Sequence, residues 1–356
     1  MQSPSHHLRA LVKRIVTFWM LSVVCFTAAV TASLAGGTAT HASTAAYSVT
    51  NLGTLGGNLD DTTEVYAINN NGQIVGKSVV VKNGTNSYHA FLYSAGKMTD
   101  LGTLKSGNES EAQAIDKYGD VAGSANTCNG CYPSNAFLYQ NGKMKDIGTL
   151  GGSCSNAYGI NDFAEVVGQA CTTSNEVAFL YSGGTMTNLG TLGGCCSSAL
   201  GINNAHQVVG WSETSTTFSS TQHAVLWSNG KITDLTALGF SASSATAINT
   251  SGQVVGGDYL WSNGTATNLG SLVGSDTQAQ AINDLGQIVG QSYLPAIGGY
   301  HAFLYRGGQM QDLNNLIPAG TGVTLVEGTG INVNGQIVCI GYNSAGYINA
   351  FLLTPQ

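Results

Sequence analysis

The 356-residue chain contains 48 glycines but few charged residues, which make up 9% of the total. Its hydrophobic residues, 43% of the chain, recur periodically, which excludes an intrinsically disordered protein. The formal net charge of -7 argues against nucleic acids and anionic membrane surfaces as partners, because both attract positively charged proteins.

Residues 1–42 have the composition of a secretory signal peptide. Arg9, Lys13 and Arg14 precede an apolar run from Ile15 to Val30, and small residues follow. An uncleaved membrane anchor is the competing interpretation, although the run is short for a bilayer span. Cleavage removes three of the 12 basic residues, which leaves nine against 19 acidic residues. We therefore expect a secreted protein, extracellular or periplasmic and without stable membrane insertion, in which residues 43–356 form one domain.

The rest of the chain repeats one unit seven times. The first copy is the stretch Ala67-Ile-Asn-Asn-Asn-Gly-Gln-Ile-Val-Gly76. Related stretches begin at Ala114, Gly159, Gly201, Ala247, Ala281 and Gly330, with 34 to 49 residues between successive starts. This is the period of a small multi-strand unit that cannot bury its own apolar face and must stack on its neighbours.

Each unit predicts four short strands. The first has the pattern Ala-x-Ala/Gly-Ile-Asn, and an Asn-x-x-Gly turn connects it to the second, Gln-Ile/Val-Val-Gly. The third, Ala-Phe-Leu-Tyr, has large apolar residues on both faces and must be covered on both by neighbouring sheets. The fourth resembles Met-Thr-Asp-Leu-Gly-Thr-Leu. Four strands in about 45 residues indicate an all-β protein, a seven-bladed β-propeller, whereas the coils of a β-solenoid are shorter.

The chain begins and ends out of register with this unit. It opens on a fourth-type segment, Tyr47 to Gly53, and it stops on a third-type segment, Phe351 to Gln356. We therefore expect the N-terminal strand to complete the last blade as its outer strand. A ring closed in this way hides its final sheet edges, and we expect a monomer.

The repeats resemble the HAF extracellular repeat family over roughly residues 47–353. The residues that carry the resemblance are His-Ala-Phe-Leu-Tyr at His89 and His301, the segment Asp-Leu-Gly-Thr-Leu, and the pattern Gly-Ile-Asn-x-x-Gly-Gln-Val-Val-Gly. The resemblance implies an extracellular repeat protein, and the family offers no catalytic residue or cofactor to transfer. Other copies place Asn135, Val177, Gly257 and Asn349 where the histidine would stand, so the histidine is not essential to the unit.

Recurring polar residues have structural interpretations. Asn can replace His89, His223 or His301 as a hydrogen-bond partner but not easily as a metal ligand. The aspartates of the fourth strands alternate with asparagines in the same way, which preserves an acceptor and discards the charge. We therefore predict no catalytic residue, no metal and no cofactor.

Six cysteines are candidates for disulfide bonds in an exported protein: Cys128, Cys131, Cys154, Cys171, Cys195 and Cys196. The spacing of Cys128 and Cys131 also suits zinc, but no second such pair accompanies them. Cys154 and Cys171 flank the first hairpin of their blade, which should bring them close together. The adjacent Cys195 and Cys196 cannot be paired from the sequence, and Cys339 is expected to be a buried free thiol.

The segments between the second and third strands vary most, and in a propeller they leave by one face, around the channel mouth. The aromatic residues that we predict to bind a ligand there are Tyr132, Trp211, Phe218, Tyr293 and Tyr300. These features favour an exported, non-enzymatic binding or surface-interaction propeller whose partner is a carbohydrate or a protein. The alternative is a propeller hydrolase or lyase with its site at the channel mouth.

Overall fold

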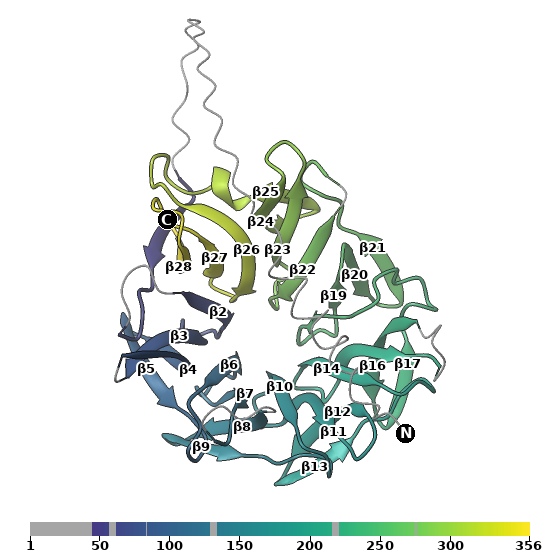
Figure 1. Cartoon of the computed structure of the whole chain (residues 1–356). Helices are drawn as coiled ribbons and strands as arrows, with labels where there is room; N and C mark the ends of the chain where they lie inside the picture. Colours follow the sequence, from purple (N-terminus) through teal and green to yellow (C-terminus); the bar gives the residue numbers. More distant parts are fainter. Residues whose placement is uncertain (1–44, 57–61, 83, 129–133, 216–220, 275) are drawn as a thin grey trace, which may run out of the picture. The chain divides into compact units, whose positions relative to one another are not determined.

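The computed structural model describes residues 45–56, 62–82, 84–128, 134–215, 221–274 and 276–356. The predicted signal peptide lies outside these residues. The described residues form seven four-stranded antiparallel sheets arranged as the blades of a propeller (Figure 1). They include no helix that is both long and apolar enough to span a lipid bilayer.

The strands fall into four sets according to their place in a blade. The innermost strands are β2 (Thr63–Ile68), β6 (Ser110–Ile115), β10 (Ser155–Ile160), β14 (Ser197–Ile202), β18 (Ala247–Ile248), β22 (Thr277–Ile282) and β26 (Thr324–Ile331). The second strands are β3 (Ile74–Lys82), β7 (Val121–Ala125), β11 (Val166–Cys171), β15 (Val208–Glu213), β19 (Val254–Gly256), β23 (Ile288–Leu294) and β27 (Ile337–Tyr342).

The third strands are β4 (Thr85–Ser94), β8 (Asn135–Gln140), β12 (Glu176–Ser182), β16 (Gln222–Ser228), β20 (Tyr259–Ser262), β24 (Gly299–Arg306) and β28 (Ile348–Pro355). The outer strands are β5 (Lys97–Gly102), β9 (Lys143–Asp146), β13 (Thr185–Asn188), β17 (Lys231–Asp234), β21 (Thr265–Asn268), β25 (Gln309–Asp312) and β1 (Tyr47–Asn51). A short 3-10 helix, η1 (Leu313–Asn315), follows β25. We number the blades 1 to 7 in the order of their innermost strands.

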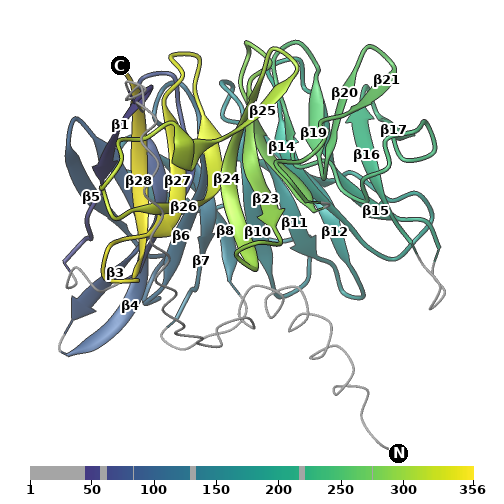
Figure 2. The ribbon, with the colours of Figure 1, turned by 90° about the horizontal axis from the view of Figure 1, so that it is seen from above.

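Each innermost strand contacts the innermost strands of both neighbouring blades, so the seven surround one axis. Figure 2 shows the same ring at right angles, with the strands running between its two faces. A bulge in the innermost strand recurs at the start of the Ala-x-Ala/Gly motif, as between Val65 and Ala67. Beside it, a Cβ on Gly76 would lie 1.9 Å from the backbone oxygen of Glu64, which explains the glycine of Val-Val-Gly.

The hydrophobic core is divided among the seven blade interfaces. Each cluster of buried residues combines two neighbouring blades. Between blades 1 and 2, for example, Val75 and Ala90 pack with Ala112 and Phe137. The third strand is therefore covered on both faces, as its sequence predicted.

The ring closes through its two ends. β1 pairs with β28 in antiparallel register from Tyr47 opposite Pro355 to Asn51 opposite Phe351. The predicted seven-bladed propeller, completed by its N-terminal strand, is confirmed. Tyr47 and Leu52 are buried by this pairing, so closure covers apolar surface as well as a sheet edge.

Candidate functional site

The propeller presents two different faces. The Asn-x-x-Gly turns between first and second strands lie on one, which we call the turn face. The loops between second and third strands lie on the other, the variable-loop face, because antiparallel neighbours place successive connections at opposite ends of a strand.

Tyr293 and Tyr300 are brought together on the variable-loop face of blade 6. They stand opposite each other on β23 and β24, with their ring centroids 5.3 Å apart in an edge-on arrangement. The Tyr300 hydroxyl donates to the Asp276 carboxylate, and this hydrogen bond, together with burial, raises the pKa of Tyr300 to about 12. Both side chains remain partly exposed.

Trp211, which was also predicted to bind a ligand, lies on blade 4 and does not join this pair. Trp211 is not at a loop tip: it lies within β15, paired with Ser198 and Ala224, and it is half-buried. The physical reason is that strand pairing continues into the segment that the sequence suggested to be a loop, because aromatic residues suit a half-buried pleated surface. Tyr132 and Phe218 lie outside the described residues.

Further apolar side chains are exposed on the variable-loop face of blades 6 and 7. Tyr342 and Tyr347 are 40% and 42% exposed at the β27–β28 hairpin of blade 7, and Ile348 beside them is 40% exposed. Ile297, between β23 and β24, is also exposed. Two neighbouring blades thus display aromatic and aliphatic groups on the same face, and gatherings of exposed apolar side chains are typical of interaction sites.

A charged cluster lies nearer the axis, at the end of the innermost strands that faces the variable loops. Lys77 Nζ lies 3.3 Å from Glu64 Oε2 and 3.5 Å from Glu111 Oε2, and Tyr66 Oη donates to Glu64 Oε2 over 2.6 Å. Burial lowers the pKa of Lys77, but the two carboxylates outweigh it and leave the pKa raised. Burial and Glu64 likewise hold the pKa of Tyr66 well above its usual range.

Glu327 on β26 extends the acidic character of this region. Its side chain is buried, and burial raises its pKa to about 7, opposed by a hydrogen bond with Gln280 and assisted by the charge of Glu64. These residues were not predicted, because the pattern recognised in the first strand consists only of its recurring small residues. The signal was in the other positions of that strand, where Glu64, Glu111 and Glu327 differ from the polar neutral residues of most copies.

The histidines hold neighbouring strands together. His89, His223 and His301 place Nδ1 at 2.9, 2.8 and 2.7 Å from Asp100, Asp234 and Asp312. In blade 2, Asn135 replaces the histidine and donates to Asp146.

The fourth-strand acid also accepts a turn hydrogen bond. Gly102 N donates to Asp100, and Gly53 N donates in the same way to Asn51. Exchange of Asp for Asn at this position thus preserves one hydrogen-bond acceptor, as predicted. These hydrogen bonds give the residues a structural role.

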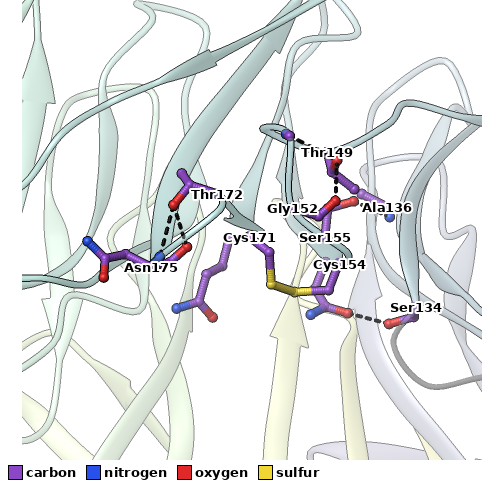
Figure 3. Close-up of a disulfide and its surroundings, with 12 residues drawn as sticks. Ser134, Ala136, Thr149, Gly152, Cys154, Ser155, Cys171, Thr172 and Asn175 are labelled. Atoms are coloured by element: carbon purple, nitrogen blue, oxygen red, sulfur yellow. Dashed lines mark hydrogen bonds between the residues drawn. A yellow bond between two sulfur atoms is a disulfide. The ribbon is translucent and has the colours of Figure 1, made fainter. Parts of the chain in front are cut away.

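The cysteines divide into bonded and free groups. Cys154 and Cys171 form a disulfide across β10 and β11 (Figure 3). Cys128 is also disulfide-bonded, and Cys131 lies outside the described residues.

Cys195 and Cys196 are free thiols, with their sulfurs 2.6 Å apart and Cys195 Sγ 2.9 Å from Glu213 Oε2. The proposed disulfide role is therefore wrong for these two. The reason is that Glu213 occupies in blade 4 the place of Cys171 in blade 3. Cys339 is a buried free thiol, as expected.

The turn face contains a ring of asparagine side chains. Asn69 Nδ2 donates to Asp116 O of the next blade over 2.8 Å, and equivalent bonds follow from Asn161, Asn203, Asn249, Asn283 and Asn332. Each side chain also bridges its own turn, as where Asn69 Oδ1 accepts from Asn71 N and Gln73 N. The asparagine of the repeat therefore joins blades as well as shaping the turn.

The ring surrounds a cavity of about 250 Å³ on the propeller axis, which we call the axial socket. Seven isoleucines line it, one from the end of each innermost strand: Ile68, Ile115, Ile160, Ile202, Ile248, Ile282 and Ile331. The residues after the ring positions also line it, and they include Lys117, Asp162, Asn204 and Asp284. This cavity was not predicted, because the aromatic residues of the repeat loops pointed to the opposite face.

A scan of known protein families finds no match to the chain, and a search of curated proteins finds none. Among solved structures, the β-propeller domain of the Trilobed protease from Pyrococcus furiosus matches with a TM-score of 0.53 and 10% sequence identity, over 82% of this chain and 95% of that one. This likeness shows the fold alone. Its title describes an open velcro topology, whereas β1 completes the last blade here.

A second solved structure has a title that names a candidate gluconolactonase. It matches with a TM-score of 0.34 and 8% identity, over 62% of this chain and 81% of that one, which is too distant a likeness to indicate a shared fold. The resemblance to HAF repeats stays a prediction.

Proposed function

We propose that this protein is an exported, non-enzymatic binding propeller that holds a polysaccharide on its variable-loop face. The observation that supports the proposal is the group of aromatic side chains on adjacent blades 6 and 7: Tyr293 and Tyr300 on one hairpin, Tyr342 and Tyr347 on the next. Rigid sheets position these rings, so binding requires little ordering of the protein.

A polysaccharide fits this surface better than a protein does. Tyrosine offers a flat apolar face for a sugar ring and a hydroxyl at its edge. The Tyr300 hydroxyl is already oriented by Asp276, which leaves its ring fixed. The Asp276 carboxylate beside it and the Ser, Thr and Asn residues of these loops can exchange hydrogen bonds with sugar hydroxyls. A protein partner is the other outcome of the test below.

The test is a screen of the protein, expressed with its native leader, against a panel of polysaccharides, followed by titration with the best ligand. The double variant Tyr300→Ala with Tyr347→Ala should weaken binding about tenfold or more, as expected for central aromatic contacts. Tyr118→Ala with Phe163→Ala is the matched control, because these two rings are exposed on the turn face. Equal binding by both double variants would contradict the proposed surface.

A hydrolase or lyase is the second candidate, and one observation favours it. Glu327 has a pKa near 7 and lies close enough to Glu64 for their charges to interact, in a region that also contains Lys77 and Tyr66. A carboxyl group with such a pKa can exchange protons at neutral pH. Turnover of a polysaccharide that Glu327→Gln abolishes while binding survives would establish this function; no turnover by the unmodified protein would exclude it for the ligands tested.

A further inference from the structure

A second cavity, of about 360 Å³, lies on the turn face between blades 6 and 7, and we call it the rim pocket. Its walls come from the Asn-x-x-Gly turns of both blades, from the end of β24 and from the paired ends of β1 and β28. The residues that line it include Tyr47, Leu285, Gln287, Arg306, Val333 and Pro355. A cavity of this volume suits a small organic molecule.

Arg306 provides the charged side chain of the rim pocket. It is the last residue of β24 and the only arginine after residue 14 of the sequence. Its Nε donates to Gln311 Oε1 over 3.2 Å, which orients the guanidinium. Among the described residues, its terminal amino groups have no hydrogen-bond or ion-pair partner, and no Asp or Glu lines the pocket. The pocket therefore presents an unpaired guanidinium, the group that binds carboxylates through two parallel hydrogen bonds.

The hydroxyl of Tyr47 is a second unused donor at the same pocket. The side chain is 4% exposed and packs in the core at the junction of blades 6 and 7. Its Oη makes no hydrogen bond within the part of the chain that the structure describes, yet it is not sealed from solvent, so it opens toward the pocket. Burial raises the pKa of Tyr47, the charge of Arg306 opposes this, and Cys339 adds to the rise, so the hydroxyl keeps its proton.

Apolar side chains form much of the remaining wall. Leu285 is 67% exposed, and Val333 and Pro355 also line the pocket. Burying this apolar surface under a ligand is favourable, since it removes hydrocarbon from water. An apolar wall beside two unused donors, one of them cationic, suits an anion that has a hydrocarbon body.

From these contacts we propose that the rim pocket binds a small monocarboxylate with a compact apolar body. The carboxylate pairs with the guanidinium of Arg306 and accepts a hydrogen bond from the Tyr47 hydroxyl, while the hydrocarbon lies against Leu285 and its apolar neighbours. Both unused donors then have a partner. The site is on the opposite face from the proposed polysaccharide surface and does not depend on it.

The test uses phenylacetate as the probe and phenylacetamide as its uncharged counterpart, with binding followed by calorimetry or NMR line broadening on the full chain. Phenylacetamide should bind at least about tenfold more weakly, since it lacks the charge that pairs with the guanidinium. Arg306→Gln should weaken phenylacetate binding about tenfold or more for the same reason. Lys231→Gln is the matched control, because it removes one exposed cation from the corresponding hairpin of blade 4.

Tyr47→Phe separates a binding role of the hydroxyl from a structural one. It should weaken phenylacetate binding about tenfold, the effect of one hydrogen bond to a charged group, without lowering the melting temperature. The melting temperature is unaffected because the hydroxyl has no partner in the unliganded protein. A lower melting temperature with unchanged binding would contradict the proposal.

The competing occupants give different results. Acetate or inorganic phosphate that binds as tightly as phenylacetate would overturn the proposal in favour of a simple anion site. Absence of binding by all three anions at millimolar concentrations would overturn it in favour of an arginine paired within the chain. Equal phenylacetate affinity in Arg306→Gln and the unmodified protein would show that the probe binds elsewhere.

Discussion

Single residues that depart from the sevenfold repeat determine the chemical properties of the two faces. Asp116 differs from its six asparagine counterparts by the replacement of an amide nitrogen with an oxygen, yet that change leaves a buried acceptor without a partner. Burial raises the pKa of Asp116, and the carboxylates of Asp120 and Asp162 raise it further, against the hydrogen bonds from the backbone N of Asp120 and of Tyr118. The neutral form of this side chain is therefore favoured by folding.

Asp116→Asn should stabilise the protein and reduce the dependence of its stability on pH. Because the folded-state pKa of Asp116 is raised, its contribution to stability is fully present below the unfolded pKa of about 3.9. It is lost as pH rises through the folded-state value. The asparagine avoids that loss and adds one buried hydrogen bond to Asn161 O, worth about 1 kcal/mol. Urea unfolding at pH 4 and pH 7 measures this, and an equal stability difference at both pH values would contradict the titration of Asp116.

At the scale of the element, hairpins of the same design differ in how they are reinforced. Blade 3 uses Ala164 where most turns use glycine, and blade 4 uses His206; both residues adopt positive φ, 54° and 59°. The disulfide between Cys154 and Cys171 ties the strands of the first hairpin of blade 3. In blade 4, His206 instead bonds Glu165 over 2.7 Å and stacks on Phe163. A disulfide therefore links the strands of the first of these hairpins and not those of the second.

Cys154→Ser should destabilise the protein by about 2–4 kcal/mol, the usual effect of losing a disulfide bond that closes a loop in the chain. The residues lie 17 apart in sequence. The matched control is Cys196→Ser, because Cys196 accepts a hydrogen bond from Glu213 N just as Cys154 accepts one from Cys171 N, yet forms no disulfide. Thermal unfolding under non-reducing conditions provides the comparison, and similar losses in both variants would argue against a stabilising cross-link.

Ala164→Gly should stabilise the same hairpin by up to about 1 kcal/mol. Alanine at φ 54° bears a steric penalty that glycine avoids, although glycine gains more freedom in the unfolded chain. His206→Gly should not show this gain, since it also removes the contacts with Glu165 and Phe163. Chemical denaturation of the two variants tests the difference, and a destabilised Ala164→Gly protein would show that conformational strain is not the deciding term.

On the scale of the whole molecule, the stability of the ring depends on the pairing of β1 with β28. Removing residues 45–53 should expose the edge of β28 and the apolar neighbours of Tyr47 and Leu52. We expect this truncated protein to aggregate or to lose a single cooperative melting transition, whereas a protein that lacks only residues 1–44 should keep it. Calorimetry compares the two, and identical melting would show that β1 does not close the ring.

The architecture was predictable because every copy repeats the same local signals. The turn asparagines, the glycine of Val-Val-Gly and the third strand with apolar residues on both faces can each be recognised within a single repeat. The offset of the two chain ends from the repeat indicates how the ring closes. The sites were less predictable. Glu64, Glu111 and Glu327 approach one another only because three separate blades meet at an axis, and Trp211 could not be distinguished from a loop residue until its strand pairing was known.

The pairing of β1 with β28 also determines when the protein can finish folding. Tyr47 stands opposite Pro355, so the first strand synthesised is among the last to find its partner. Blades 1 to 6 are built from consecutive strands and can form as the chain emerges, while blade 7 must wait for the C-terminus and close a loop of nearly the entire domain. Such a non-local contact is slow to form and governs the rate of the final step. Until it forms, β28 has an open edge, and this is the period in which the chain is most prone to aggregate.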